Sequence, residues 1–365
     1  MRIAQIVSSY QPRLGGVETH VRHIAEGCAR AGDEVTVFTH GVDGAPAEEI
    51  SAGVRVCRFP LTVNSAAYPF SLSLFRGFRT RAGDFDVAHV HSYHTLAAHA
   101  AVGTGVPLVF TPHYHGTGHT KMRAVLHRLY RPAGSRIFQA ADAIVCVSEA
   151  ERDLVVRDFP GTAKKAGIIP NGVGPRTRSP GSGLALPPGP VLLAVGRLER
   201  YKNVDLILKA FRTLPCHAVL VVVGEGPERE RLAQQAGIDG TGGPVILTGG
   251  IPDSQLDWLL ATATVVVSAS DHEAFGLTMA EGLAAGTRIV ASPIPAHAEL
   301  ARLAGDDALV TLADPRDTTA FAGLLAEALA AGRPAADAVK LPSWAEVITD
   351  TRDLYSRVRS QRLPA

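Results

Sequence analysis

Cysteine is scarce in this chain, apolar runs are short, and charge of neither sign dominates. The 365 residues include only four cysteines, Cys28, Cys57, Cys146 and Cys216. They show no paired spacing, so we expect neither a disulfide framework nor a zinc knuckle, which fits a reducing compartment. No apolar run approaches the roughly 20 residues that a membrane-spanning helix requires, and the first residues enter a strand pattern rather than a signal peptide. These absences predict a cytoplasmic protein.

The near-equal numbers of basic and acidic residues do not identify a binding partner. There are 36 basic and 35 acidic residues, a formal charge of +1, so overall electrostatics indicate no nucleic-acid partner. Basic residues exceed acidic ones between Arg76 and Arg136, which is typical of a solvated face but could favour an anionic acceptor or the inner face of a membrane. Within the region 121–136, the stretch Lys121–Tyr130 would place apolar and basic residues on opposite faces of a helix. Such a helix either packs its apolar face on a core or contacts a membrane peripherally. We favour packing on a core.

Short β-rich runs alternate with helical patterns along the chain, which predicts an α/β fold of parallel sheets with crossover helices. The length suits two domains of ordinary size. In the first half we expect strands at Arg2–Ser8, Glu34–Thr39, Val54–Phe59, Asp86–Val90, Pro107–Thr111, Ala143–Val147 and Gly167–Ile169.

A segment rich in Pro, Gly and Ser, residues 171–190, follows this series and is interpreted as an interdomain linker. It separates a predicted domain at 1–170 from a second at 191–343. Strands of the second domain are expected at Val191–Val195, Ala218–Val223, Val245–Thr248, Thr264–Ser268, Arg288–Ala291 and Leu309–Thr311. A last helix, Trp344–Arg359, has no strand after it.

The segment Glu273–Glu281 holds two carboxylates around a Phe-Gly turn and the start of an apolar helix. A strand, a tight turn and a helix N-terminus form an anion site, because unpaired backbone N–H groups and the helix dipole point at the turn. A glutamate on each side suits a ligand with phosphate in the middle and hydroxyl groups at both ends. We therefore expect a sugar nucleotide, with Glu273 at the transferred sugar and Glu281 at the ribose, although Glu281 could be an ordinary helix carboxylate.

This segment resembles the glutamate–seven–glutamate signature of GT4, a large family of retaining glycosyltransferases with the GT-B fold. Other family motifs occur in the same order: Gly15-Gly16-Val17-Glu18, His113 within Thr111–His115, Ser148-Glu149, Asn171-Gly172-Val173, Gly196-Arg197 with Lys202-Asn203, and Gly224-Glu225-Gly226-Pro227. The resemblance spans nearly the whole chain. It implies two facing Rossmann-like, doubly wound domains with a cleft between them, and a C-terminal helix, within 344–365, that crosses back onto the first domain.

Two cations follow the first strand of the second domain, and we expect them to bind a diphosphate. Arg197 can fork two oxygens, and Lys202 is a compact charge. The alternative is a surface ion pair with Glu199 or Glu225. The backbone N–H groups of Phe275, Gly276 and Leu277 would bind the same diphosphate, and Gly224 would shape the floor of the nucleotide pocket. A third glycine is missing there, so a nicotinamide cofactor is not expected.

On the acceptor side, Gly15 and Gly16 resemble the loop that the family places against the diphosphate and acceptor. Glu18 would then bind ligand, or would only stabilise the helix dipole. By the same resemblance, His113 lies near the 6-position and anomeric carbon of the sugar, and His115 is a weaker candidate.

The histidine spacings His89-x-His91 and His113-x-His115 invite a zinc site. Both pairs lie at strand ends with no cysteine or carboxylate to complete a ligand set, so we predict no metal. Asp84-Phe85-Asp86 matches the metal motif of the other major glycosyltransferase fold, but it leads into a strand and is interpreted as a coincidence. Ser292–Glu299 departs from the glycine pair and glutamate usual in the family, which leaves the donor sugar open.

These features predict a metal-independent retaining glycosyltransferase without a cofactor. It would move a hexosyl-type sugar from a UDP- or GDP-sugar to a hydroxyl acceptor by front-face attack, with His113, Arg197, Lys202 and Glu273 as catalytic residues. The alternatives are a sugar-nucleotide epimerase of the same fold and a non-catalytic sugar-nucleotide scaffold.

Overall fold

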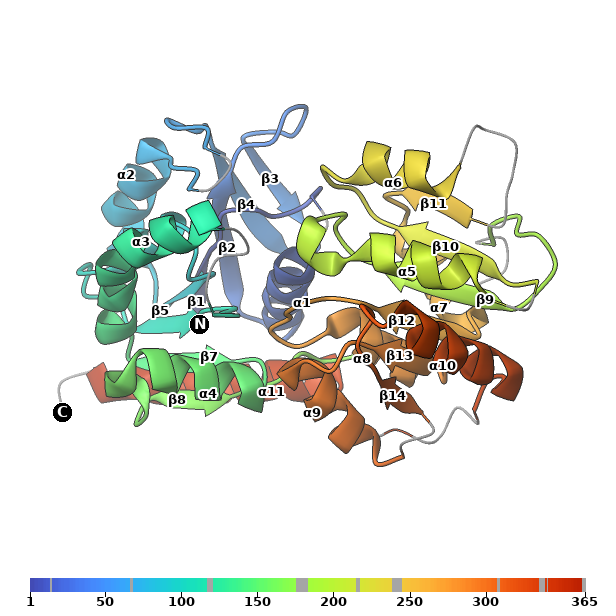
Figure 1. Cartoon of the computed structure of the whole chain (residues 1–365). Coiled ribbons are helices and arrows are strands. Elements are labelled where there is room, and N and C mark those ends of the chain that lie inside the picture. The colour runs from blue at the N-terminus through green and yellow to red at the C-terminus, as the bar shows by residue number, and fades with distance from the viewer. Residues whose placement is uncertain are drawn as a thin grey trace. The chain divides into compact units, whose positions relative to one another are not determined.

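The computed structural model describes residues 1–13, 15–65, 68–116, 121–174, 183–214, 217–237, 245–306, 309–334, 339 and 341–362, without the side chains of 121–129. It divides into two compact units, each built on its own sheet (Figure 1). Unit 1 comprises Met1–Gly172 and Pro342–Ala365, and unit 2 comprises Val173–Leu341. Part of the predicted linker, 175–182, lies outside the described residues.

Unit 1 contains an eight-stranded sheet in the order β3-β4-β2-β1-β5-β6-β7-β8. Its strands are β1 (Arg2–Ile6), β2 (Glu34–His40), β3 (Glu48–Ser51), β4 (Val54–Phe59), β5 (Val87–His91), β6 (Leu108–Thr111), β7 (Ala143–Cys146) and β8 (Ala166–Ile168). All seven strands predicted for this half are present, with ends shifted by at most two residues. They pair in parallel, as the alternation of strand and helix patterns predicted.

The edge strand β3 was not predicted, and it departs from the expected parallel sheet because it pairs antiparallel with β4. The two strands form a hairpin whose turn residues, Ala52 and Gly53, have φ of 49° and 80°. Two positive φ angles are what a tight two-residue hairpin needs. The polar run Glu48–Ser51 carries no apolar alternation that would have marked it as a strand.

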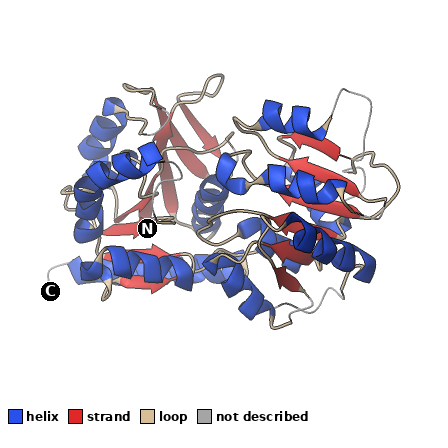
Figure 2. Cartoon of the chain, viewed as in Figure 1, coloured by secondary structure: helices blue, strands red, loops and turns tan. Residues whose placement is uncertain are grey.

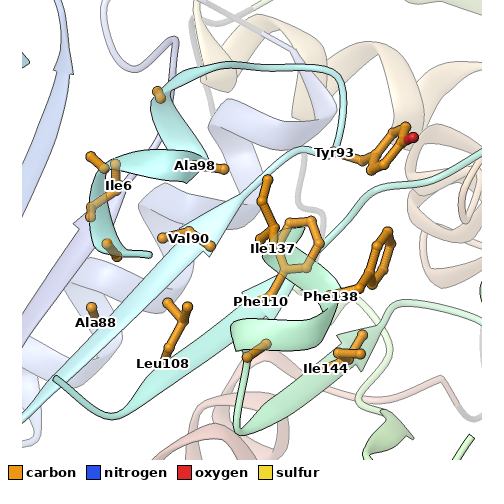
Figure 3. Packing of buried hydrophobic residues seen from close by; sticks show 14 of the residues in the cluster. Ile6, Ala88, Val90, Tyr93, Ala98, Leu108, Phe110, Ile137, Phe138 and Ile144 are labelled. Atoms are coloured by element: carbon orange, nitrogen blue, oxygen red, sulfur yellow. The ribbon is translucent and has the colours of Figure 1, made fainter. Parts of the chain in front are cut away.

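Helices cover the sheet of unit 1, and Figure 2 distinguishes them from the strands. They are α1 (Gly16–Arg30), α2 (Leu72–Arg81), α3 (Lys121–Ala140), α4 (Glu149–Asp158), α11 (Trp344–Arg362) and the 3-10 turns η1 (Ala82–Asp84), η2 (Ala97–Ala101) and η3 (Pro160–Thr162). Between sheet and helices lies a hydrophobic core in which Ile6, Val90 and Phe110 pack against Ile137 and Phe138 of α3 (Figure 3).

The C-terminal helix α11 belongs to unit 1, where it packs on α1. A Cβ on Gly27 would lie 2.1 Å from Ile348 Cδ1, so the absence of a side chain there permits the close approach. Arg352 Nε donates to Asp33 Oδ2 at 2.7 Å, and the buried Tyr355 hydroxyl bonds Gln5 and His89. Helix α11 therefore contributes polar contacts to the interior of unit 1.

Unit 2 contains a six-stranded sheet, in the order β11-β10-β9-β12-β13-β14, whose strands all pair in parallel. Its strands are β9 (Val191–Val195), β10 (Val219–Val223), β11 (Val245–Gly249), β12 (Val265–Ser268), β13 (Arg288–Ala291) and β14 (Val310–Leu312). Its helices are η4 (Arg200–Lys202), α5 (Val204–Arg212), α6 (Arg229–Ala236), α7 (Asp253–Thr262), α8 (Leu277–Ala284), α9 (Pro295–Ala304) and α10 (Thr318–Ala331). The six predicted strands are all present.

Among the described residues, no helix combines the length and the apolar character needed to cross a bilayer. Peripheral contact through the region 121–136 stays a prediction. The backbone of this region forms most of α3, but the side chains of 121–129, which would show the basic face, lie outside the described residues.

Candidate functional site

The predicted diphosphate-binding residues of unit 2 lie beyond the carboxyl ends of β9 and β12, which are neighbours in the sheet. In parallel sheets, this edge is where ligands bind. The loop after β9 carries Arg197 and leads into η4, which ends at Lys202. The loop after β12 carries Ser270 and Glu273, and a small pocket lies between the loops, lined by Gly196, Arg197, Lys202, Ala269 and Ser270 among others.

Lys202, which lines this pocket, forms an ion pair with Glu273, although 71 positions separate the two residues in the chain. The Lys202 ammonium donates to Glu273 Oε1, and the Ser270 hydroxyl donates to the same oxygen at 2.9 Å. Both charged side chains are about one-fifth exposed. Burial opposes both charges, but the ion pair outweighs it, so the pKa of Glu273 is lowered and the pKa of Lys202 is raised. The pair is therefore charged at neutral pH and accessible to a ligand.

Arg197 is the more exposed cation of the predicted pair, with 61% of its side chain accessible. Its Nη1 lies 4.0 Å from Glu199 Oε1, the outer limit of an ion pair. The other alternative partner, Glu225, lies 3.9 Å from Arg229 instead. An exposed ion pair of this kind is worth little, so its loss costs little when the guanidinium turns to a ligand phosphate.

The Phe-Gly turn lies next to Glu273, as the motif predicted. Gly276 has φ of 87° and precedes α8, so the left-handed conformation itself favours glycine there. Phe275 is buried, and α8 begins at Leu277. Glu281 is 6% exposed in the body of α8. The structure thus supplies the helix N-terminus that an anion needs.

Gly224 has a structural reason to be glycine. A Cβ on it would lie 2.0 Å from the Gly196 carbonyl oxygen, and one on Gly226 would lie 2.4 Å from the Leu198 carbonyl oxygen. The loop after β10 therefore packs directly on the backbone of the loop that carries Arg197. Gly224 therefore lies against Gly196, which lines the pocket, while its role at the floor of a nucleotide pocket stays a prediction.

His297 was missed by the sequence reasoning. It is fully buried in α9, its Nδ1 lies 2.8 Å from the Ser292 carbonyl oxygen, and its ring lies under Gly276. Burial lowers its pKa, while the nearby Glu273 charge raises it in part. The only signal in the sequence was the departure of Ser292–Glu299 from the family pattern.

In unit 1, Gly15 precedes α1 and Gly16 begins it. A Cβ on Gly15 would lie 2.4 Å from Glu18 Oε2, so the Glu18 side chain folds back over the glycine. This position in the first helical turn is compatible with dipole stabilisation and with ligand binding alike.

His113 follows β6 with φ of 46°, a left-handed conformation that costs energy in a non-glycine residue. Its ring lies against that of His20, with centroids 5.0 Å apart. His115 points elsewhere and stacks on His94, with centroids 5.2 Å apart. The structure therefore places the two predicted histidines in different surroundings.

Two further residues support the His113 segment. Glu151 is buried and accepts hydrogen bonds from the backbone N–H groups of Tyr114 and Val147, at 2.5 and 2.6 Å. Asn171 Oδ1 lies 2.6 Å from His20 Nδ1. Asn171 and Ser148, the N-cap of the helix that holds Glu151, lie in the quoted motifs, but no local pattern indicated their partners.

Glu151→Gln is expected to lower the free energy of unfolding by about 1–3 kcal/mol. The amide puts an NH₂ group where a carboxylate oxygen accepts a backbone N–H, so one buried donor loses its partner. Urea unfolding above pH 8, where the raised pKa of about 8 leaves Glu151 ionised, measures the change. Glu149→Gln, exposed in the same helical turn, is the control, and an equal loss in both variants would contradict the explanation.

Comparison with known proteins places these features in a family. Residues 14–176 match the model for Glycosyltransferase Family 4, and residues 180–340 match that for Glycosyl transferases group 1. D-inositol 3-phosphate glycosyltransferase 1 of Catenulispora acidiphila is 30% identical, covering 82% of this chain and 80% of that protein. Glycogen synthase of Mycobacterium tuberculosis is 29% identical, covering 100% of this chain and 97% of that protein.

A solved structure supports the same assignment of fold. Anabaena HepE in complex with UDP and glucose has a TM-score of 0.73 to this chain at 18% identity, covering 98% of this chain and 100% of that one. The agreement extends over both parallel-sheet units. Together with the family matches and the 30% identical relative, it shows that the chain belongs to the GT4-type glycosyltransferases and has the GT-B fold.

Proposed function

We propose that the protein is a retaining glycosyltransferase that moves a hexosyl-type sugar from a UDP- or GDP-sugar to a hydroxyl acceptor. The observation that carries this proposal is the Lys202–Glu273 ion pair beside the start of α8. It combines a cation and a helix N-terminus for phosphate with a carboxylate for sugar hydroxyls. The HepE complex, which holds UDP and glucose, supports a donor of this class.

In the proposed mechanism, the charge that develops on the leaving diphosphate is stabilised by Lys202, Arg197 and the N–H groups at the start of α8. Glu273 holds hydroxyls of the transferred sugar, and its lowered pKa keeps it an acceptor. Glu281 is assigned to the ribose and His113 to the sugar. These cations supply the charge that a metal would otherwise provide, so the transfer is metal-independent. The donor phosphate takes the acceptor proton as the hydroxyl attacks from the front face.

Thermal shift with UDP, GDP, ADP and their sugar conjugates in EDTA tests this proposal. A ligand at a hundred times its dissociation constant adds about 2.7 kcal/mol to stability, so a clear rise in Tm for one nucleotide family is expected. Acceptor screens with that donor then separate transfer from epimerisation of donor alone and from binding without turnover. A response only after manganese is added would contradict metal independence.

Arg197→Ala is expected to lower kcat/KM about 10- to 100-fold, because a charged hydrogen bond to phosphate contributes roughly 1.5–3 kcal/mol. Steady-state kinetics on the donor found by thermal shift measure it. The control is Arg229→Ala, which removes a partly exposed arginine near a glutamate of this unit and should leave kcat/KM unchanged. Normal turnover of Arg197→Ala would remove this residue from the mechanism.

A further inference from the structure

Three histidines from separate segments meet inside unit 1: His20 of α1, His91 at the end of β5, and His113 after β6. One ring nitrogen of each lies within 4.8 Å of the others. His20 is 2% exposed and His91 is fully buried, while His113 is half-buried. Neither histidine pair that the sequence suggested forms this group, since His89 and His115 are absent from it.

Hydrogen bonds fix which nitrogen of His91 faces the group. Gln5 Nε2 donates to the Tyr355 hydroxyl at 3.0 Å, so Gln5 Oε1 is the atom that meets His91 Nε2, at 2.7 Å. The amide oxygen can only accept, so His91 carries its proton on Nε2 and leaves a lone pair on Nδ1. For His20, the oxygen Oδ1 of Asn171 faces Nδ1 at 2.6 Å, so Nδ1 carries the proton and the lone pair lies on Nε2.

His89 lies beside the group but has no nitrogen to offer. Its Nδ1 lies 2.6 Å from the Tyr355 hydroxyl, and its Nε2 lies 2.7 Å from the Thr111 hydroxyl. By contrast, His20 Nε2, His91 Nδ1 and His113 Nε2 are buried and have no hydrogen-bond partner in the described part of the chain. Buried polar atoms are seldom left unpaired, because the lost hydration is not replaced.

Each of the three nitrogens presents a lone pair to the others, so a positively charged or hydrogen-donating group is needed between them. A water molecule has two hydrogens and would leave one of the three unsatisfied. One added proton could join at most two of the nitrogens and would likewise leave the third unsatisfied. Neutral imidazole nitrogens that converge on one point are common ligands of Zn²⁺ and of other first-row transition metal ions.

We propose that His20, His91 and His113 bind a single Zn²⁺ ion, with water at the fourth position. Zn–N bonds of about 2.0–2.1 Å require the nitrogens to approach one another, and His113, half-buried on a loop, is the ring placed to close in. Gln5 and Asn171 act as the outer partners that fix ring orientation in zinc sites.

This proposal is independent of the glycosyl transfer proposed above. A metal on His113 Nε2 leaves Nδ1–H to donate to a sugar hydroxyl, and the diphosphate-binding cations lie in unit 2. The metal would hold the strained His113 backbone in place through β5 and α1. It revises the expectation of no metal that the histidine spacing alone supported.

Cobalt titration of the chelator-treated full chain, free of any histidine tag and without nucleotide, tests the site. We expect the visible absorption bands of four-coordinate Co²⁺ to saturate at one ion per chain and to be abolished by Zn²⁺. Zn²⁺ should also raise the Tm. If the wild-type chain shows neither bands nor a Tm rise, the proposal is overturned without recourse to any variant.

Variants then identify the ligands. His20→Gln and His91→Gln should lose the bands, and Asn171→Ala should weaken Zn²⁺ binding about 10- to 100-fold. His99→Gln, which removes a partly buried histidine bonded to the Tyr130 hydroxyl, is the control and should bind normally. Circular dichroism confirms that each variant is folded. Unchanged stoichiometry and affinity in folded His20→Gln and His91→Gln would overturn the assignment, whatever the transferase assays show.

Discussion

Lys202→Ala is expected to lower kcat about 100- to 1,000-fold, the loss typical when one preorganised donor to a developing negative charge is removed. The variant loses a cation that lines the pocket and also deprives Glu273 of its ion-pair partner. The pKa of Glu273 should then rise, because the Lys202 charge no longer opposes the effect of burial. A loss confined to kcat, with KM little changed, would indicate that the lysine acts mainly in the transition state.

The matched control for this variant is Arg200→Ala. Arg200 lies in the same η4 turn, but its side chain is 84% exposed and pairs with Glu228 at 3.2 Å, so kcat should not change. A Lys202→Arg variant keeps the charge but replaces a compact ammonium by a planar fork, and only partial recovery is expected. Hexosyl transfer at the normal rate by Lys202→Ala would rule out the proposed role of this residue.

Unit 1 is expected to lose stability steeply as the pH falls from about 6.5 to about 4. Burial lowers the pKa values of its histidines His20, His40, His89, His91, His99 and His113. Each must then be protonated on unfolding in this window, so the unfolded chain binds more protons than the folded one. Stability therefore rises with pH through the window and is lost as pH falls below the unfolded value of about 6.5.

His40 gives this prediction a magnitude and a test. It is 5% exposed at the end of β2, and burial, with a smaller contribution from Arg13, lowers its pKa to about 4. The shift corresponds to about 3 kcal/mol of stability at neutral pH that is lost in acid. Urea unfolding in EDTA at several pH values measures the slope, which should be shallower in His40→Gln than in the wild-type chain.

Glu151 contributes with the opposite sign. Its burial raises its pKa to about 8, against the hydrogen bonds from Val147 and Tyr114, so the folded chain binds the extra proton between about 4.5 and 8. The contribution of Glu151 to the free energy of unfolding therefore falls as pH rises through that range. Because several histidines oppose this single glutamate, the free energy of unfolding of unit 1 should still decrease as the pH falls. Equal stability at pH 7 and pH 5 would contradict this balance.

Much of unit 2 was determined by local sequence. The runs Val191–Val195 and Arg288–Ala291 formed strands at the predicted residues, because buried parallel strands are continuously apolar and end abruptly at glycine or polar residues. The turn at Gly276 and the helix start at Leu277 were also predictable, since a strand, a glycine and an apolar helix repeat are all short-range signals. The hairpin strand β3 was not predictable, because its polar residues show no alternation of apolar and polar side chains.

The partners of the charged and polar residues were decided only by the tertiary structure. The sequence placed Lys202 and Glu273 in one site by resemblance, but their ion pair depends on β9 and β12 being neighbours in the sheet. Likewise, histidine spacing suggested the pairs 89/91 and 113/115, whereas the folded chain groups His20, His91 and His113. Adjacent strands, and a helix from a distant segment, bring such side chains together. Sequence spacing therefore determined which strands and turns form, and packing between them decided which side chains meet.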